Sequence, residues 1–266
     1  MERRTFLAFL AVGGAQLLTG CSADSRGDQA AGTGTAGTGT IGAVPAGESA
    51  TPAAAALPTP KVPLPDHPIT ALPGPGRYLA LTVDDGASSE VVGAYAQWAA
   101  DSGARFTFFV TGQFDAWRDN KKALAPLVES GQIQLGNHSW THADLTSLTA
   151  AGVAQELGRC EKFLKNTYGV TGTPYYRPPF GYRNAAVDKV AADLGYTMPT
   201  LWDGSLSDSG LVTEKFLIGA ARRYFRAQRI VIGHANHEPV TRVYGRFNEI
   251  IAHRRLQTVT LNDYFA

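Results

Sequence analysis

From Arg77 to the end of the chain, short apolar runs alternate with longer stretches of amphipathic pattern. The short runs have the length and apolar content of buried strands, and the longer ones have the spacing of helices. We predict strands at 78–83, 105–110, 132–136, 174–177, 197–202, 229–233 and 257–261. We predict helices at about 88–101, 120–130, 149–167, 184–194, 213–227 and 243–254.

Residues that favour helix ends lie at several of these boundaries. Thr149 and Asn184 can cap helix N-termini with their side-chain oxygens. Four helical stretches are followed by a glycine, which favours the left-handed conformation of a helix C-terminus: Gly103, Gly131, Gly169 and Gly195. These signals support the predicted helix boundaries.

Seven strands that alternate with helices predict a parallel α/β domain. We favour a closed or partly closed barrel of βα units over an open sheet, because every candidate catalytic residue falls at or just after a strand's carboxyl end. Open α/β sheets also place their sites there, so this observation supports the parallel arrangement more strongly than the barrel. No internal repeat or second change of composition indicates another domain.

The first 75 residues lack this alternation. Residues 1–20 join the basic pair Arg3-Arg4 to a short apolar stretch, as export signals do, and end in Leu18-Thr19-Gly20 before Cys21. This ending resembles a bacterial lipobox, in which the cysteine is lipidated, and the segment around Arg3-Arg4 resembles a twin-arginine signal. We therefore expect an extracytoplasmic protein, anchored through Cys21 to the bacterial cell membrane. An ordinary cleaved secretory signal is the alternative.

Composition separates a tether from a folded domain. Residues 21–75 are rich in Ala, Gly, Thr and Pro and predict a flexible tether, whereas 76–266 have the apolar content of a domain. The whole chain has a net charge of +1, and without residues 1–20 it has 22 basic and 22 acidic residues. A neutral chain gives no reason to expect nucleic acid as a partner. If Cys21 carries lipid, Cys160 has no disulfide partner, and its helical position predicts a buried residue.

Two adjacent carboxylates, Asp84 and Asp85, follow the first apolar run and precede Gly86. At the end of a buried strand they would repel each other and lose hydration, so a metal ion or a catalytic role is the usual reason to keep both. The alternative is a helix N-cap followed by a solvated acid, which is common where a strand leads into a helix.

Other polar groups follow later strands. His138 and His142 lie four residues apart and can meet one ion if their segment is helical or tightly turned. Imidazole suits zinc, cobalt and similar ions, and a carboxylate can complete such a site. Arg177 precedes two prolines and can present its guanidinium to a carboxylate, unless it is a surface residue of a structural turn. His234 ends a buried run, and His237 is its alternative.

These segments, in this order, resemble the polysaccharide deacetylase family, the NodB-homology domain of carbohydrate esterases. The resemblance covers about residues 77–263. Thr-Val-Asp-Asp-Gly at 82–86 resembles the family's T-F-D-D-G, His-Ser-Trp-Thr-His at 138–142 its H-[ST]-x-x-H, and Arg-Pro-Pro-Phe-Gly at 177–181 its R-x-P-[YF]. The resemblance implies a distorted (β/α)7 barrel with its active site at the carboxyl ends of the strands, which agrees with the seven predicted strands.

The resemblance also implies roles for single residues. A divalent metal, usually zinc and alternatively cobalt or manganese, would have three ligands: Asp85, His138 and His142. Asp84 would be the general base and Arg177 its ion-pair partner. Asp208, in the polar loop 201–209, would orient His234, which would protonate the departing amine. The backbone amide of Phe180 would help to bind the oxyanion.

The implied function is metal-dependent deacetylation of N-acetylated sugars in a cell-surface polysaccharide, peptidoglycan or a chitin-like polymer, by a monomer. The alternatives are an O-acetyl esterase acting on xylan-type polymers, a catalytically inactive carbohydrate-binding lipoprotein, and a hydrolase of small cyclic amides, against which the export signal argues. The chain departs from the family pattern at four positions: Val83, Ser209, Ile232 and Ala235. The last three bear on the acetyl pocket and therefore on acyl specificity.

Overall fold

The computed structural model describes residues 57–266. The predicted signal segment, Cys21 and most of the predicted tether lie outside these residues. None of the helices in the described part is both long enough and apolar enough to cross a bilayer.

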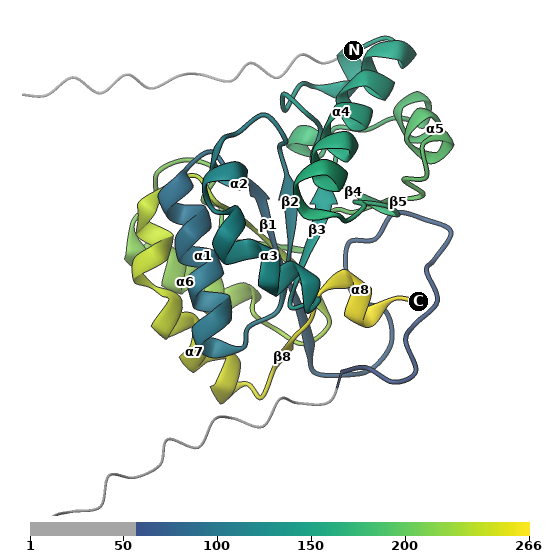
Figure 1. Cartoon of the computed structure of the whole chain (residues 1–266). Helices are drawn as coiled ribbons and strands as arrows, with labels where there is room; N and C mark the ends of the chain where they lie inside the picture. The colour runs from purple at the N-terminus through teal and green to yellow at the C-terminus, as the bar shows by residue number, and fades with distance from the viewer. Residues whose placement is uncertain (1–56) are drawn as a thin grey trace, which may run out of the picture. The chain divides into compact units, whose positions relative to one another are not determined.

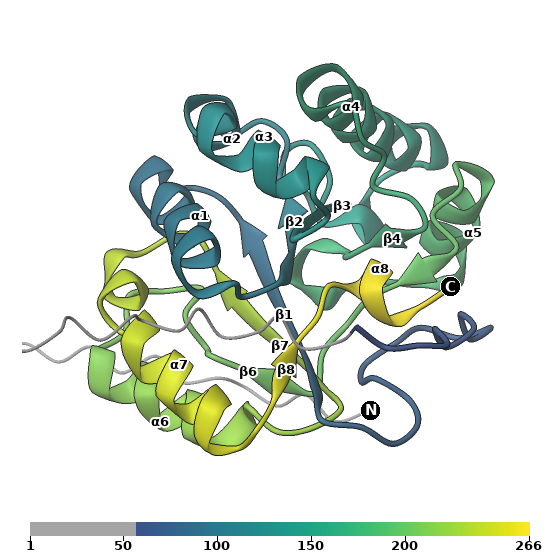
Figure 2. The same ribbon diagram turned by 60° about the horizontal axis from the view of Figure 1, so that its bottom comes forward.

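A curled sheet of parallel strands forms the centre of the domain (Figures 1 and 2). Its order is β5-β4-β3-β2-β1-β7-β6, and β8 pairs with the first two residues of β1. The strands are β1 (Tyr78–Asp85), β2 (Phe106–Val110), β3 (Ile133–Asn137), β4 (Tyr175–Tyr176), β5 (Met198–Pro199), β6 (Gly204–Ser205), β7 (Arg229–His234) and β8 (Gln257–Thr258). Each of the seven predicted strands is present, and β6 is an additional short one.

Most of the helices lie on the outside of this sheet (Figure 2), whereas Leu261 and Tyr264 of the last one pack in the apolar cluster inside it. The helices are α1 (Ser89–Ser102), α2 (Ala116–Asp119), α3 (Lys121–Glu129), α4 (Ala150–Tyr168), α5 (Ala185–Asp193), α6 (Glu214–Tyr224), α7 (Tyr244–His253) and α8 (Leu261–Tyr264). Short 3-10 turns occur at η1 (Leu145–Ser147), η2 (Pro179–Gly181) and η3 (Glu238–Arg242). Thr149 and Asn184 cap α4 and α5 as predicted, by accepting hydrogen bonds from Gly152 and Val187.

Some predicted elements differ in length from the observed ones. The helix predicted at 120–130 begins at residue 116 and is divided at Asn120, whose side chain donates to the Ala116 carbonyl. The strands predicted at 174–177 and 197–202 each keep two residues, and the first is flanked by Pro174 and Pro178, which have no N–H for a ladder. The last predicted strand stops at Thr258, because Thr260 and Asp263 form the capping box of α8.

The chain before β1 packs onto the domain, although part of it was assigned to the tether. Val62 is hydrogen-bonded to Tyr264 and Ala266, and Ile69 to Pro199 and Leu201. Ile69 is buried in the inner apolar cluster, on the inside of the curled sheet. Residues 62–72 therefore belong to the packed domain, which begins earlier than the predicted boundary at residue 76.

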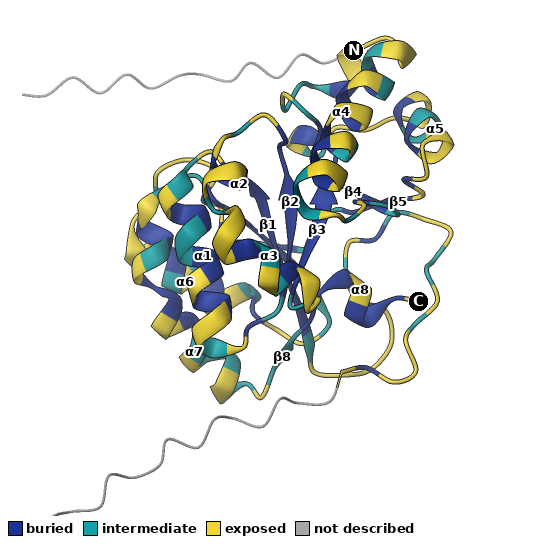
Figure 3. Cartoon of the chain, in the orientation of Figure 1, coloured by how far each residue is buried: buried dark blue, intermediate teal, exposed yellow. Residues whose placement is uncertain are grey.

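Alternation along the strands decides which side chains face the inside of the curled sheet. In β1, Leu79, Leu81 and Val83 pack with the helices, and Ala80 packs in the inner cluster. Because side chains alternate, Thr82 and Asp84 share the inner face with Ala80. Figure 3 shows the strands buried and the outer faces of the helices exposed. The interior thus carries apolar residues at its base and polar ones toward the carboxyl ends.

Candidate active site

A buried ion pair lies at the carboxyl end of β1. The Nη1 of Arg177 is 2.6 Å from Oδ1 of Asp84, and both side chains are almost completely buried. The other N–H groups of Arg177 donate to Thr82 Oγ1 at 2.9 Å and to the carbonyls of Thr200 and Leu201 at 3.0 and 3.1 Å. Burial lowers the pKa of Arg177 and Asp84 opposes that shift. A guanidinium stays protonated in proteins, so Arg177 is a buried charge held by these contacts, and its interpretation as a surface residue is wrong.

Asp85 faces two histidines beside this pair. Its Oδ1 is 3.4 Å from Nε2 of His138 and 3.3 Å from Nε2 of His142. Ligand atoms of the three residues all lie within 4.8 Å of one another. The interpretation of Asp84 and Asp85 as a helix cap and a solvated acid is wrong, since both are buried and Ser88 caps α1.

The donor atoms of this cluster fit a divalent ion. Asp85 Oδ1 is buried and accepts no hydrogen bond from any residue in the range 57–266. His138 Nδ1 lies 2.7 Å from the Arg177 carbonyl oxygen, to which it can only donate, so a neutral His138 has its lone pair on Nε2. An anionic oxygen and imidazole nitrogens are ligands that zinc accepts.

Electrostatics favour the charge states that a metal requires in two of the three residues. Burial acts to raise the pKa of Asp85, but His138, Asn236 and His142 outweigh it and hold that pKa below its usual range. Burial and the neighbouring His138 lower the pKa of His142, which keeps it neutral. Burial also acts to lower the pKa of His138, yet Asp84 and Asp85 raise it. A cation between these groups would replace the proton that the two carboxylates attract to His138.

The backbone gives this cluster its shape through left-handed residues. Asp85 ends β1 with a φ of 71°, and His142 has a φ of 62°. Ser139 Oγ accepts the His142 N–H at 2.9 Å, so the histidine segment is a tight turn and not a helix. Such conformations are costly for residues other than glycine, and surrounding structure must hold them.

Two residues that sequence reasoning missed support the cluster. Glu156 of α4 is buried and accepts the N–H groups of Trp140 and Thr141 at 3.0 and 2.7 Å, which fixes the histidine turn. Asn236 donates to Oδ2 of Asp85 at 2.7 Å and accepts from the Ala87 N–H at 3.2 Å. Asn236 therefore leaves Oδ1 of Asp85 as the oxygen facing the histidines. In the sequence, only its position two residues after His234 could have indicated that Asn236 belongs to the site.

A second histidine–carboxylate pair lies next to Asp84. Strand pairing puts His234, the last residue of β7, opposite Asp84 in register. His234 Nδ1 is 2.9 Å from Oδ1 of the buried Asp208. Burial acts to lower the pKa of His234, but Asp208 and the carboxylates of β1 outweigh it and raise that pKa. His237, the alternative to His234, is the N-cap of η3, and no contact joins it to the cluster within the described residues.

Phe180 borders the histidine cluster on its solvent side. Its backbone is left-handed, with a φ of 60°, and its side chain is 57% exposed. Its ring meets that of His142 edge to face, with centroids 4.6 Å apart. The amides of Gly181 and Tyr182 close the η2 turn, whereas within residues 57–266 the Phe180 N–H has no acceptor. This N–H is a free donor at the edge of the cluster.

The structure brings together Asp84, Asp85, His138, His142, Arg177, Asp208 and His234, and the four departures differ in their surroundings. Val83 packs in the apolar layer between the sheet and the helices, so this departure from the family pattern affects the packing of the core. Ile232 and Ala235 are buried, and Ser209 is exposed. Cys160 is buried as predicted, and burial raises the pKa of its thiol.

Comparison with known proteins agrees with this arrangement. Residues 71–199 match the family model for polysaccharide deacetylase. The chain is 33% identical over 131 residues to a chitin deacetylase of Pestalotiopsis, which covers 48% of this chain and 42% of the relative. It is 33% identical over 151 residues to the peptidoglycan-N-acetylglucosamine deacetylase PgdA of Listeria monocytogenes, which covers 54% and 30%. The aligned part is thus less than half of either relative's length.

Solved structures share the fold. The chain superposes with a TM-score of 0.66 and 20% identity on a mutant, with restored enzymatic activity, of a CE4 family pseudoenzyme from Bacillus anthracis. That match covers 76% of this chain and 72% of the other. The predicted distorted (β/α)7 barrel with parallel strands is therefore confirmed.

Proposed function

We propose that this chain is a polysaccharide deacetylase, as the family-model match over residues 71–199 supports, and that it removes acetyl groups from N-acetylated sugars of a cell-surface polysaccharide by metal-dependent hydrolysis. One observation carries the proposal: Asp85 Oδ1 lies within 3.4 Å of two histidine nitrogens, without a hydrogen bond, beside the buried pair of Asp84 and Arg177.

The proposal assigns Asp85, His138 and His142 as the ligands of one divalent metal, most suitably zinc, with cobalt or manganese as alternatives. When bound, this ion supplies a Lewis acid that polarises the acetyl carbonyl. The remaining steps belong to side chains and backbone groups of the domain.

Asp84 is proposed to act as the general base, which takes a proton from the attacking water. Its contact with Arg177 occupies and fixes Oδ1, so Oδ2 is the oxygen that can receive the proton. The Phe180 N–H is proposed to stabilise the negative charge that develops on the carbonyl oxygen. Its lack of an internal acceptor supports this role.

His234 is proposed to donate a proton to the departing amine nitrogen. Amide cleavage needs such a donor, because an amine anion is a poor leaving group. The carboxylate of Asp208 orients the ring through Nδ1 and leaves Nε2–H available for the substrate. The raised pKa of His234 favours the protonated form that the step consumes.

The relatives support the substrate class. One is named for chitin and another for the N-acetylglucosamine of peptidoglycan. Both polymers carry acetamido groups on a sugar, which is the bond that the acid–base pair above is suited to hydrolyse. We assign this chain the same class of N-acetylated polysaccharide and a monomeric state.

We also propose that the protein is exported and held at the outer side of the cell membrane by lipid on Cys21. The support is the Leu18-Thr19-Gly20-Cys21 ending and the basic pair Arg3-Arg4. The Cys21→Ala variant, expressed in a bacterial host with a lipoprotein pathway, should lose labelling by radioactive palmitate and its membrane fraction. Unchanged labelling would contradict the anchor.

Acetate release tests the enzymatic proposal. The purified chain is stripped of metal, resupplied with zinc, cobalt or manganese, and incubated with chitin oligomers, peptidoglycan fragments and acetylated xylan. We expect metal-dependent acetate release from the N-acetylated substrates. Release from xylan alone would make the protein an O-acetyl esterase. Sugar binding without release under every metal would make it an inactive binding protein.

A further inference from the structure

The end of the domain opposite the candidate active site holds a concentration of unpaired arginines. Seven of the fourteen arginines in residues 57–266 contact a carboxylate. Five of the other seven line two adjoining pockets that share His253 and Arg254: Arg77, Arg222, Arg226, Arg254 and Arg255. The chain as a whole has a net charge of only +1, so this is a local accumulation of positive charge.

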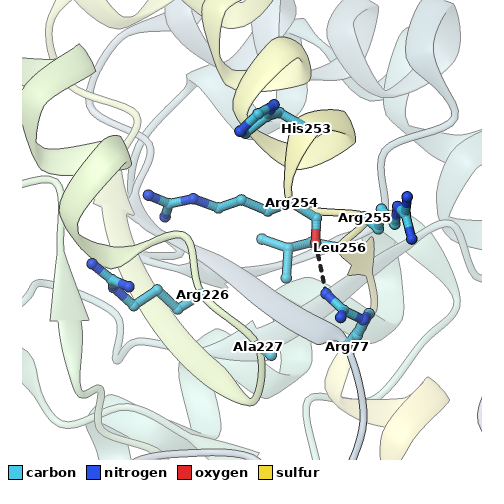
Figure 4. Close-up of a pocket in the computed structure, with 7 residues that line it drawn as sticks. All are labelled: Arg77, Arg226, Ala227, His253, Arg254, Arg255 and Leu256. Carbon is cyan, nitrogen blue, oxygen red and sulfur yellow. Dashed lines mark hydrogen bonds between the residues drawn. The ribbon is translucent and has the colours of Figure 1, made fainter.

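The first of these pockets, of about 430 Å³, is formed where three strands begin. Arg77 precedes β1, Arg226 precedes β7, and Leu256 precedes β8. Figure 4 shows Arg226 and Arg254 on one side and Arg77 and Arg255 on the other, with Leu256 between them. Since β1 spans eight residues at about 3.3 Å each, the pocket lies roughly 23 Å from Asp85.

Backbone contacts hold the pocket together. The Gln257 N–H donates to the Arg77 carbonyl at 2.8 Å, and Arg77 Nη1 donates to the Arg254 carbonyl at 3.2 Å. Arg254 in turn donates to the carbonyls of Phe225 and Arg222, at the C-terminus of α6. The segments before β1, after α6 and after α7 are thus fixed to one another, and the pocket is a built feature of the fold.

Interaction with helix C-termini accounts for only some of these arginines. Cations favour helix C-termini, and Arg254 takes that role by binding two carbonyls of α6. Arg255 does not, because within residues 57–266 its guanidinium has no hydrogen-bond or carboxylate partner. It also has a left-handed φ of 52°, which is costly for arginine. Arg226 uses only Nε, toward the Arg223 carbonyl, and keeps its terminal N–H groups free.

We propose that this pocket binds a phosphate-bearing anion through Arg77, Arg226 and Arg255, with Arg254 as the fixed charge behind them. Each guanidinium offers five N–H donors in a planar fork that matches the oxygens of phosphate. Several guanidinium groups line one cavity, and Arg254 is already held at the C-terminus of α6. Together they offer a phosphate dianion more hydrogen-bond donors than one surface arginine does. Phosphate can reach the pocket as a free ion or as a phospholipid headgroup, and both present the same oxygens.

The test compares phosphate sources on the full chain. Titration calorimetry with inorganic phosphate is run beside co-sedimentation with vesicles of phosphatidylcholine, with and without phosphatidylglycerol. The double variant Arg226→Gln/Arg255→Gln removes two forks, and Lys122→Gln, an exposed lysine of α3, is the matched control. We expect phosphate affinity at least about tenfold weaker in the double variant and unchanged in the control, because the double variant loses two guanidinium groups that would bind the anion with charge-assisted hydrogen bonds.

The possible outcomes distinguish the two sources of phosphate, and they also show whether the pocket binds phosphate at all. Binding of phosphate and of anionic vesicles, both weakened in the double variant, supports the pocket with a headgroup as its ligand. Phosphate binding weakened in the variant, with no preference for anionic vesicles, supports the pocket with free phosphate as its ligand. Absent phosphate binding, or binding that the double variant leaves unchanged, overturns the proposal. Acetate release is expected to be the same in all these variants, so the result does not depend on the proposed enzymatic function.

Discussion

The charged residues at the two ends of the barrel differ in their burial and in how many of their polar atoms have partners. At the carboxyl end, Asp84, Asp85 and Arg177 are buried, and in the site described above Oδ1 of Asp85 and Oδ2 of Asp208 are buried without a hydrogen-bond partner. At the amino end, Arg226 and Arg255 are exposed and keep most of their donors free. A buried charge without a partner is costly, so Oδ1 of Asp85, which lies between two histidine nitrogens, points to a specific ligand. Exposed charges cost little, and their accumulation points to a ligand from solution.

The sharpest test of the carboxyl end concerns Asp84, the proposed general base. Asp84→Asn keeps the size of the side chain but removes the proton acceptor, so we expect acetate release to fall by about 10²- to 10⁴-fold. Bound zinc, measured by atomic absorption after gel filtration, should stay near one ion per chain. Turnover equal to that of the unaltered protein would show that another group is the base.

Asn236 should tune the metal site without taking part in the reaction. Asn236→Ala frees Oδ2 of Asp85 and loosens the carboxylate, so we expect metal affinity to fall by about 10- to 100-fold. Competition with a chromogenic chelator measures the affinity directly. Asn166→Ala, at an exposed position of α4, is the control. Equal affinity in both variants would mean that Asn236 has no role in orienting Asp85.

The pH profile of activity tests His234 as the proposed acid. The raised pKa of His234 means that the ring stays protonated to higher pH, and activity is lost as pH rises through that pKa. Asp208→Asn removes the carboxylate that helps to raise it, so the alkaline limb of kcat/KM should move down by about one pH unit. An alkaline limb at the same pH in the two proteins would assign the limb to another group.

The smallest effects are expected at the amino end, where two neighbouring arginines differ in their contacts. Arg254→Gln removes the guanidinium that binds two carbonyls of α6, and we expect the free energy of unfolding to fall by about 1–2 kcal/mol. Arg255→Gln should change it by less than about 0.5 kcal/mol. Urea denaturation measures both. Equal losses would mean that Arg255 has a structural role that its contacts do not reveal.

The sequence by itself determined the order of elements and the residue types of the site. Apolar periodicity located all seven predicted strands, because a parallel sheet covered by helices needs continuous apolar runs. Asp84, Asp85, His138, Arg177 and His234 could be singled out since each follows such a run, and parallel strands end at one edge. The short motifs then linked these residues to one family.

Only the tertiary structure decided which atoms face one another. Asn236 and Glu156 lie 151 and 15–16 positions from the residues they hold, and neither belongs to a recognisable pattern. Two predicted strands are only two residues long, and residues 62–72 joined the domain through backbone hydrogen bonds that composition does not encode. The arginine pocket arises because three loops meet where β1, β7 and β8 begin. Contacts between distant segments depend on how the chain packs, and a linear pattern records only local preference.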